Sequence, residues 1–284
     1  MKTVFFGTSH YSAQFLELIL KANFKVDLVI SAPPKPVGRK QILTDSPTVV
    51  VAQKYNLPFI LSLKELASQE NLKIGLILDY NRIIPQSIID LFPQGIINIH
   101  FSKLPQYRGP APVQQTILDG QENAWITYYL ITAGLDEGPI LSQTSLPLSG
   151  NETTASLYET LITKAAGEIS QIVRDYLEGK ITLQSQPGEP SFTEKLTVEK
   201  TKIDWRKAPE ELDRLIRAAS PEPGAWTEVK LSTKQESPPK RLKILKAHLE
   251  NSNLILDQVQ LEGKNPVSLK QFKEGYPEME IIKQ

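Results

Sequence analysis

The stretch IGLILDYNRIIPQSIIDLFPQGIINIH (74–100) contains two short apolar runs, at 74–79 and 95–100, and we predict that each forms a buried strand. Similar runs occur at 3–7, 26–31 and 57–61, and amphipathic helical segments lie between them. Strands that alternate with helices indicate βαβ units and a parallel sheet. We therefore predict an α/β fold of the Rossmann-like kind, in which ligands bind at the carboxyl edge of the sheet.

Two polar side chains close the strand at 95–100. Residues i and i+2 of a strand point to the same face, so Asn98 and His100 share one face. The turn GLDEGP (134–139) adds a carboxylate, Asp136. These three groups are a minimal set for acyl transfer to an amine, because an amide stabilises a developing oxyanion while an imidazole and a carboxylate move a proton. The alternative is that Asn98 and His100 are ordinary polar strand ends that hydrogen-bond to loop backbone.

The second half of the chain changes character after a long helical pattern at 153–178. A polar, proline-bearing stretch follows, and then one helical segment and several short strand-like runs. Short strands at regular spacing suggest a small β-barrel or a sandwich, and of these we favour the barrel (OB-like). We predict a catalytic domain at 1–184, a linker at 185–202 and a β-barrel-like C-terminal domain at 203–284.

The composition excludes several classes of function. The 32 basic and 32 acidic residues cancel, so no overall field marks a nucleic-acid or membrane-surface protein. The absence of cysteine excludes thiolate catalysis, disulfides and Cys-ligated zinc. The three histidines show no ligand spacing, so we predict no metal. No signal-peptide core and no apolar stretch of ~18 residues is visible, and we expect a cytoplasmic protein with no membrane partner.

Longer motifs resemble a known family. NIHFSKLPQYRGPAPVQQTILDG (98–120) resembles the N-x-H-x-S-L-L-P-x-x-R-G-x-x-P signature of the folate-dependent formyltransferases, and GLDEGPIL (134–141) resembles their catalytic aspartate loop. The segment 192–229 is similar to the linker and the start of the second domain in family members that act on tRNA. The resemblance implies a Rossmann-like formyltransferase domain followed by a tRNA-binding β-barrel.

The resemblance also implies a reaction. A formyl group passes from 10-formyltetrahydrofolate to the α-amino group of methionyl initiator tRNA. Asn98 would hold the carbonyl oxygen, while Asp136 and His100 would take and relay the proton, and which of the two is the formal base stays open. By the same resemblance, the folate pocket would be lined by Leu78, Asp79, Tyr80, Ile83, Pro85, Ser102, Lys103, Leu104, Pro105 and Leu135.

Three positions depart from the pattern of the family. Lys103 stands where the family has leucine, Asn81 replaces a small residue, and Trp125 is unexpected in the run before the aspartate loop. These departures leave Asn98, His100 and Asp136 untouched and affect only the expected shape of the pocket.

Basic residues near proline suggest where tRNA would bind. The resemblance places a loop equivalent to APPKPVGRKQ (32–41) against the acceptor end of tRNA, although such a charged loop is also typical of solvated surface. The predicted tRNA contacts are Lys35, Arg39, Lys40, Arg108, Lys195, Lys200 and Lys202. We expect the protein to act as a monomer.

Two other functions stay open. The first is a formyltransferase that acts on a nucleotide-linked amino sugar, since such enzymes share the N-x-H and aspartate motifs. The second is a non-catalytic nucleotide- or RNA-binding module on a Rossmann-like scaffold. GTSHYSA (7–13) lacks the G-x-G-x-x-G spacing, so the sequence gives little support for dinucleotide binding.

Overall fold

The computed structural model describes residues 2–38, 40–232 and 238–283. The chain forms two compact units. Unit 1 comprises Met1–Gly109, Trp125–Leu146 and Tyr158–Phe192, and unit 2 comprises Pro110–Ala124, Pro147–Leu157 and Thr193–Gln284. Each unit is thus built from three separate segments of sequence. The domain limits that we predict at 184 and 203 stay a prediction.

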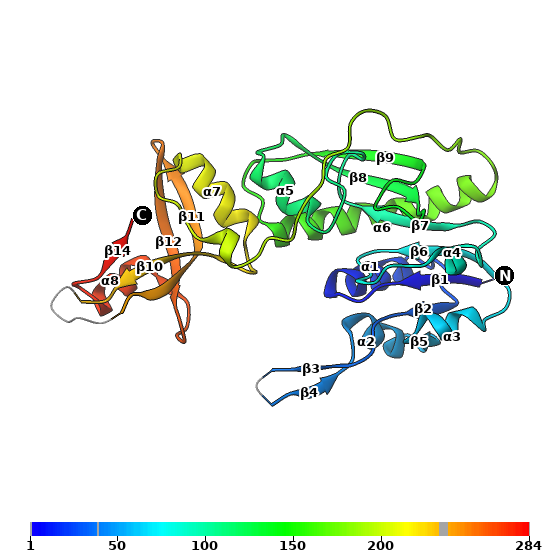
Figure 1. Cartoon of the computed structure of the whole chain (residues 1–284), viewed down its shortest axis with the longest axis horizontal. Coiled ribbons are helices and arrows are strands. Elements are labelled where there is room, and N and C mark those ends of the chain that lie inside the picture. Colours follow the sequence, from blue (N-terminus) through cyan, green and yellow to red (C-terminus); the bar gives the residue numbers. More distant parts are fainter. Residues whose placement is uncertain (1, 39, 233–237, 284) are drawn as a thin grey trace. The chain divides into compact units, whose positions relative to one another are not determined.

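A seven-stranded sheet forms the centre of unit 1, in the order β5-β2-β1-β6-β7-β8-β9 (Figure 1). Its strands are β1 (Lys2–Phe6), β2 (Leu28–Ile30), β5 (Phe59–Ile60), β6 (Leu72–Ile77), β7 (Ile96–His100), β8 (Asn123–Leu130) and β9 (Ile140–Pro147). The strands from β5 to β7 pair in parallel, and β8 pairs with β7 in antiparallel fashion. The strand order reverses between β1 and β6, which is the position where open α/β sheets bind ligands.

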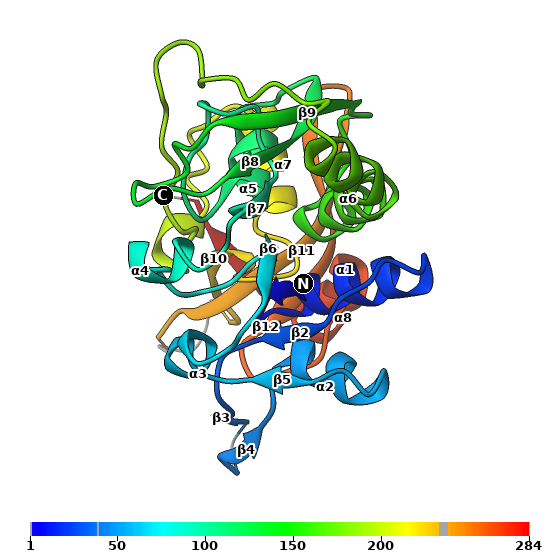
Figure 2. The same ribbon diagram turned by 90° about the vertical axis from the view of Figure 1, so that its right-hand side faces the viewer.

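Helices cover both faces of this sheet. In Figure 2, α1 (His10–Lys21), α2 (Pro47–Lys54) and α6 (Thr154–Leu177) lie on one face, and α3 (Leu63–Ala67) and α4 (Gln86–Ile89) lie on the other. Val4, Phe5 and Phe6 of β1 are therefore all fully buried. Burial on two faces explains why the strands of this unit show continuous apolar runs instead of alternation.

Serine residues cap the N-termini of two helices of unit 1. Ser46 caps α2 by accepting a hydrogen bond from the Val49 amide at 3.2 Å, and Pro47 occupies the first helical turn. Ser9 caps α1 in a reciprocal arrangement with Ser12. The Ser12 hydroxyl also donates to the Leu78 carbonyl at 2.6 Å, which fastens the start of α1 to the carboxyl end of β6.

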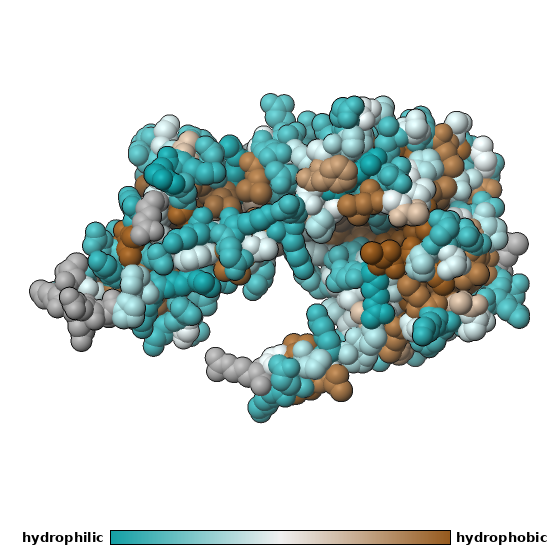
Figure 3. Space-filling view, in the orientation of Figure 1, coloured by the Kyte–Doolittle hydropathy of each residue, from teal (hydrophilic) through white to brown (hydrophobic). Residues whose placement is uncertain are grey.

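The segment 32–41, which we predict to be a loop, instead contributes to a hairpin. β3 (Lys35–Val37) and β4 (Ile42–Thr44) form a two-stranded antiparallel sheet. The prediction was wrong because Pro36 suggested a break, whereas proline is tolerated in a strand whose outer edge faces solvent. Figure 3 shows apolar side chains beside hydrophilic ones on this hairpin, and Val37, Ile42 and Leu43 are exposed.

Unit 2 is built on a five-stranded antiparallel sheet in the order β13-β12-β11-β10-β14. Its strands are β10 (Ala225–Lys230), β11 (Lys240–Glu250), β12 (Asn253–Leu261), β13 (Val267–Ser268) and β14 (Glu280–Ile282). Its helices are α5 (Pro112–Leu118), η1 (Glu199–Thr201), α7 (Pro209–Ala218) and α8 (Leu269–Gly275). Leu212 and Ile216 of α7 pack with Leu242, Val259 and Phe272 into one core. The predicted fold class, a Rossmann-like α/β domain followed by a small β domain, is confirmed.

Within the described residues, we find no helix with the length and apolar character that crossing a bilayer requires.

Candidate active site

The carboxyl ends of β1, β6 and β7 meet at one edge of the sheet, because these strands are parallel neighbours. Thr8 follows β1 and donates its amide hydrogen to the Asp79 carbonyl at 3.3 Å. Asn98 and His100 lie at the end of β7. The predicted edge therefore collects polar groups from three strands.

Tyr129 lies directly opposite Asn98 in the antiparallel register of β7 and β8. Residues that pair in this way point to the same face of the sheet. The Asn98 amide donates through Nδ2 to the Tyr129 hydroxyl at 2.8 Å. An aromatic side chain of β8 thus enters the site.

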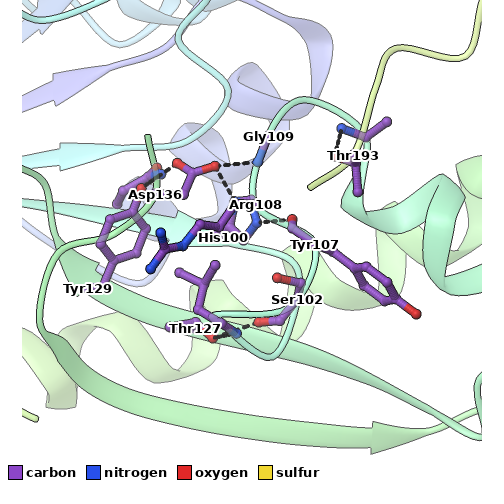
Figure 4. A network of polar contacts seen from close by, with 12 residues as sticks. His100, Ser102, Tyr107, Arg108, Gly109, Thr127, Tyr129, Asp136 and Thr193 are labelled. Atoms are coloured by element: carbon purple, nitrogen blue, oxygen red, sulfur yellow. Dashed lines mark hydrogen bonds and ion pairs between the residues drawn. The ribbon is translucent and has the colours of Figure 1, made fainter. Parts of the chain in front are cut away.

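Asp136 joins the site from the turn between β8 and β9. One carboxylate oxygen, Oδ1, accepts the Tyr129 hydroxyl at 2.6 Å, and the other, Oδ2, accepts the Gly109 amide at 2.7 Å (Figure 4). Asn98 and Asp136 are therefore both within hydrogen-bonding reach of one phenolic oxygen. The structure brings the predicted amide and carboxylate together.

The ring of His100 faces Asp136 with one nitrogen and a backbone carbonyl with the other. Nε2 lies 2.9 Å from the Tyr107 carbonyl, and a carbonyl only accepts, so we assign the proton to Nε2. Nδ1 lies 3.8 Å from Asp136 Oδ2, and both side chains are mostly buried, with 7% and 14% exposed. In this tautomer Nδ1 carries the free lone pair of the ring, and it points toward the carboxylate.

The Tyr129 hydroxyl stays protonated at all ordinary pH values. Burial, and then the nearby charge of Asp136, raise the pKa of this hydroxyl well above its usual value of 10.0. It therefore remains a permanent donor to the carboxylate.

Gln186 holds the backbone of the aspartate turn. Its amide donates to the Asp136 carbonyl at 2.8 Å and to the Gly138 carbonyl at 3.0 Å. Its own carbonyl accepts from the Arg108 guanidinium, with Nη2 at 2.7 Å. Arg108, which we predict to contact tRNA, thus contributes to this site through Gln186.

Sequence reasoning missed Tyr129 and Gln186 as members of the site. The signal for Tyr129 was its place in the run just before GLDEGP, which an antiparallel partner of β7 would align with Asn98. Gln186 gave no signal, because it lies in a polar stretch that we predict to be a linker.

The loop after β7 is fixed to β8. The Thr127 hydroxyl donates to the Ser102 carbonyl at 2.6 Å and accepts from the Leu104 amide at 3.2 Å. The Lys103 ammonium lies 4.5 Å from the centroid of the Trp125 ring. Two of the three residues that depart from the pattern of the family, Lys103 and Trp125, are therefore partners in a single contact.

The predicted folate residues fall into two groups. Four of them are buried at the carboxyl edge of the sheet: Leu78, Ser102, Leu104 and Pro105. Asp79, Tyr80, Ile83, Pro85, Lys103 and Leu135 are exposed or half-buried. Ile83 is 90% exposed and Leu135 is 58% exposed, which is unusual for such large apolar side chains. Their contact with folate stays a prediction.

The predicted tRNA residues are spread over both units. Lys35 and Lys40 are exposed near the β3–β4 hairpin, and Arg39 lies outside the described residues. Lys195, Lys200 and Lys202 belong to unit 2 and are exposed. Lys200 forms an ion pair with Glu194, and Lys202 forms one with Glu228 at 3.0 Å. Their contact with tRNA stays a prediction.

Metal binding has no structural support in the part of the chain that the structure describes. There, no group of three or more His, Cys, Asp or Glu side chains could hold a metal ion.

Comparison with known families gives two matches. The chain matches a family model described as formyl transferase over residues 1–173, and a model described as the C-terminal domain of formyl transferase over residues 195–254.

Individual relatives agree with these matches. A methionyl-tRNA formyltransferase of Protochlamydia amoebophila is 30% identical over 306 residues, which cover 97% of this chain and 95% of that protein. A methionyl-tRNA formyltransferase of Bifidobacterium longum is 34% identical over 238 residues, which cover 81% of this chain and 72% of that protein.

Solved structures share the fold. An N-formyltransferase from Helicobacter canadensis, in complex with folinic acid and dTDP-3-aminofucose, has a TM-score of 0.63 at 24% identity and covers 88% of each chain. The methionyl-tRNA formyltransferase from Clostridium thermocellum has a TM-score of 0.59 at 19% identity and covers 92% of this chain and 99% of its own. At these identities the likeness concerns the fold alone.

Proposed function

The chain belongs to the formyl transferase family, and we propose that it transfers a formyl group from 10-formyltetrahydrofolate to the α-amino group of methionyl initiator tRNA, in translation initiation. The observation that carries this proposal is the match to a methionyl-tRNA formyltransferase along nearly the full length of both chains. The match of the family's second domain to residues 195–254 adds support.

We propose that Asn98 stabilises the formyl oxygen. That oxygen gains negative charge when the amine attacks the formyl carbon of the folate donor. One N–H of the Asn98 amide bonds to Tyr129, and the second N–H of the same group can donate to the oxygen. A preorganised donor of this kind lowers the barrier by about 3–4 kcal/mol.

We propose that His100 and Asp136 move the proton. The attacking amine becomes cationic and has to lose a proton before the folate nitrogen leaves. His100 Nδ1 and Asp136 Oδ2 face each other at 3.8 Å, so that together they can accept this proton and return it to the leaving nitrogen. General acid–base catalysis of this kind contributes about 10² to 10⁴ in rate.

The edge of the sheet suits the flat, partly polar ring system of a folate. Exposed Ile83 and Leu135 offer apolar surface. The buried hydroxyl groups of Thr8 and Tyr80 have no hydrogen-bond partner among the described residues, which leaves polar groups for a ligand to satisfy.

For the acceptor, we propose that the exposed lysines at positions 35, 40, 195, 200 and 202 contact tRNA phosphates. We further propose that the enzyme works in the cytoplasm as a monomer. A sedimentation profile with a single species of about 31.8 kDa at working concentration is the expected result.

The acceptor is tested by comparing candidate substrates in parallel reactions. Purified protein receives radiolabelled 10-formyltetrahydrofolate together with methionyl initiator tRNA, with methionyl elongator tRNA, or with a nucleotide-linked amino sugar. We expect label on the initiator tRNA and at least about tenfold less on the other two. Preferential labelling of the sugar nucleotide would instead assign the chain to the sugar branch of the family. No transfer to any acceptor would reject the proposed activity.

A further inference from the structure

Tyr129 occupies a position that the proposed reaction leaves without a role. Its hydroxyl is buried, it bonds to both Asn98 and Asp136, and it comes from a strand that supplies no other catalytic side chain. We infer that Tyr129 is a positioning residue that fixes which side of the Asn98 amide faces the reacting formyl group. This inference rests on the proposed function.

The direction of the hydrogen bonds follows from the chemistry of the three groups. An ionised carboxylate only accepts, so the single proton of the Tyr129 hydroxyl goes to Asp136 Oδ1 at 2.6 Å. The hydroxyl oxygen then has only lone pairs left for Asn98. The Asn98 side chain therefore has to present its NH2 group to the hydroxyl, in agreement with the 2.8 Å contact from Nδ2.

This orientation matters for the reaction. The two ends of an amide have nearly the same shape, so sterics alone barely distinguish NH2 from oxygen. In the wrong orientation, the amide oxygen would replace the NH2 group and repel the charge that develops on the formyl oxygen. The contact with Tyr129 removes this alternative, and the charge of Asp136 sets the orientation through Tyr129. The proton acceptor and the oxyanion donor thus act as one connected group.

The neighbouring residue provides a matched control. Tyr128 is also a fully buried tyrosine of β8, and its hydroxyl donates to Glu168 at 2.9 Å. Because consecutive strand residues point to opposite faces, Tyr128 lies on the other side of the sheet from Asn98. Each Tyr→Phe change, at 128 or at 129, removes one buried hydroxyl that donates to a carboxylate. Only the hydroxyl of Tyr129 belongs to the candidate active site.

The first experiment compares the steady-state kinetics of the two variants with the wild-type protein. For Tyr129→Phe we expect kcat to fall by about 10- to 100-fold, a fraction of the 10² to 10³ lost with an entire oxyanion donor, while KM for folate and for tRNA stays within about twofold. For Tyr128→Phe we expect kcat within about threefold of wild type. Thermal unfolding of both variants verifies that they fold. Equal kcat losses in the two variants would overturn the inference.

The second experiment tests whether Tyr129 acts through Asn98. In an Asn98→Ala background there is no amide to orient, so adding Tyr129→Phe should reduce kcat by less than about threefold. A loss as large as in the wild-type background would mean that Tyr129 has a merely structural effect and would overturn the inference. An inactive wild-type protein would reject the proposed function, whereas an active wild type with additive losses rejects only the role of Tyr129.

Discussion

The backbone of Asp136 has a positive φ of +49°, a conformation that residues other than glycine rarely adopt. Such a conformation costs on the order of 1 kcal/mol or more and persists only where the surroundings enforce it. Here two donors hold the carboxylate and Gln186 holds the carbonyl oxygen of the same residue. The conformation aims the carboxylate at His100, which makes the local strain part of the site.

At this scale the sequence predicted which side chains lie together, Asn98, His100 and Asp136, but not the hydrogen bonds that connect them. The i, i+2 spacing on one strand was enough to place Asn98 and His100 on a common face. Tyr129 could not be recognised, because a tyrosine in an apolar strand is most often a core residue. Its role depends on the register between β7 and β8, and a single sequence does not give that register.

Loss of the side chain of Asn98 or of Asp136, the two groups joined through the Tyr129 hydroxyl, should abolish formyl transfer. For Asn98→Ala and for Asp136→Ala we expect kcat to fall by about 10² to 10³ or more, because each removes a group that acts on charge in the transition state. Binding of a stable folate analogue and thermal unfolding should stay near normal. Rapid mixing under single-turnover conditions measures the chemical step directly. Undiminished turnover in both variants would reject the assigned catalytic set.

Gly138 should not tolerate any side chain. A Cβ atom at this position would lie 1.7 Å from the Leu130 carbonyl oxygen, a backbone atom that cannot rotate away. We expect Gly138→Ala to lower the free energy of unfolding by about 1–3 kcal/mol and to displace the aspartate turn, so that activity falls as well. Gly150→Ala serves as a comparison for steric contact, because a Cβ there meets nothing within 4 Å, although its φ of +86° adds strain. Chemical denaturation measures both, and a Gly138→Ala variant as stable as the wild type would contradict the steric argument.

At the level of elements, the sequence predicts those with a strong apolar pattern, among them the short strands β2 and β5, and misses several short helices. Enough apolar residues recur at the spacing of a strand or of a helix in five elements: β1, β6, β7, α1 and α6. α3, α4 and α8 have between four and seven residues, so they complete two helical turns at most and show no recognisable periodicity. The β3–β4 hairpin escaped prediction because its residues are exposed and follow no alternation.

The segment around Gln186 also belongs to this scale. Gln184 exchanges backbone hydrogen bonds with Ile140 of β9, and Ser191 bonds through its backbone to Pro105 and Arg108. A stretch that we predict as a linker therefore contributes to the support of the active-site loops, because its backbone pairs where its side chains give no apolar signal.

Gln186→Ala should therefore reduce catalysis without unfolding the protein. It removes two donors from the aspartate turn and the acceptor of Arg108, so we expect kcat to fall by about 5- to 50-fold, with KM little changed. Gln184→Ala is the matched control, because its side chain is exposed and its structural role lies in the backbone. Equal activity of the two variants in the formyl transfer assay would contradict a supporting role for Gln186.

For the whole molecule, charge determines how tRNA binding should respond to salt. The 32 basic and 32 acidic residues cancel, so attraction of tRNA has to come from local groups such as Lys35 and Lys40. We expect tRNA affinity to fall by at least about tenfold between 50 and 200 mM salt, which corresponds to about two neutralised phosphates. Affinity for a folate analogue, measured in the same buffers, should change little. Salt-independent tRNA binding would contradict the proposed lysine contacts.

Because the chain crosses several times between the two units, the units cannot be separated by one cut in the polypeptide. The polypeptide passes from one unit to the other after residues 109, 124, 146, 157 and 192. No single protease cut or stop codon can release an intact half, since a fragment that ends at 192 carries two pieces of unit 2 without the remainder of that unit. On the ribosome, the same two pieces emerge early and have to wait for the segment that begins at 193 before their unit can be completed.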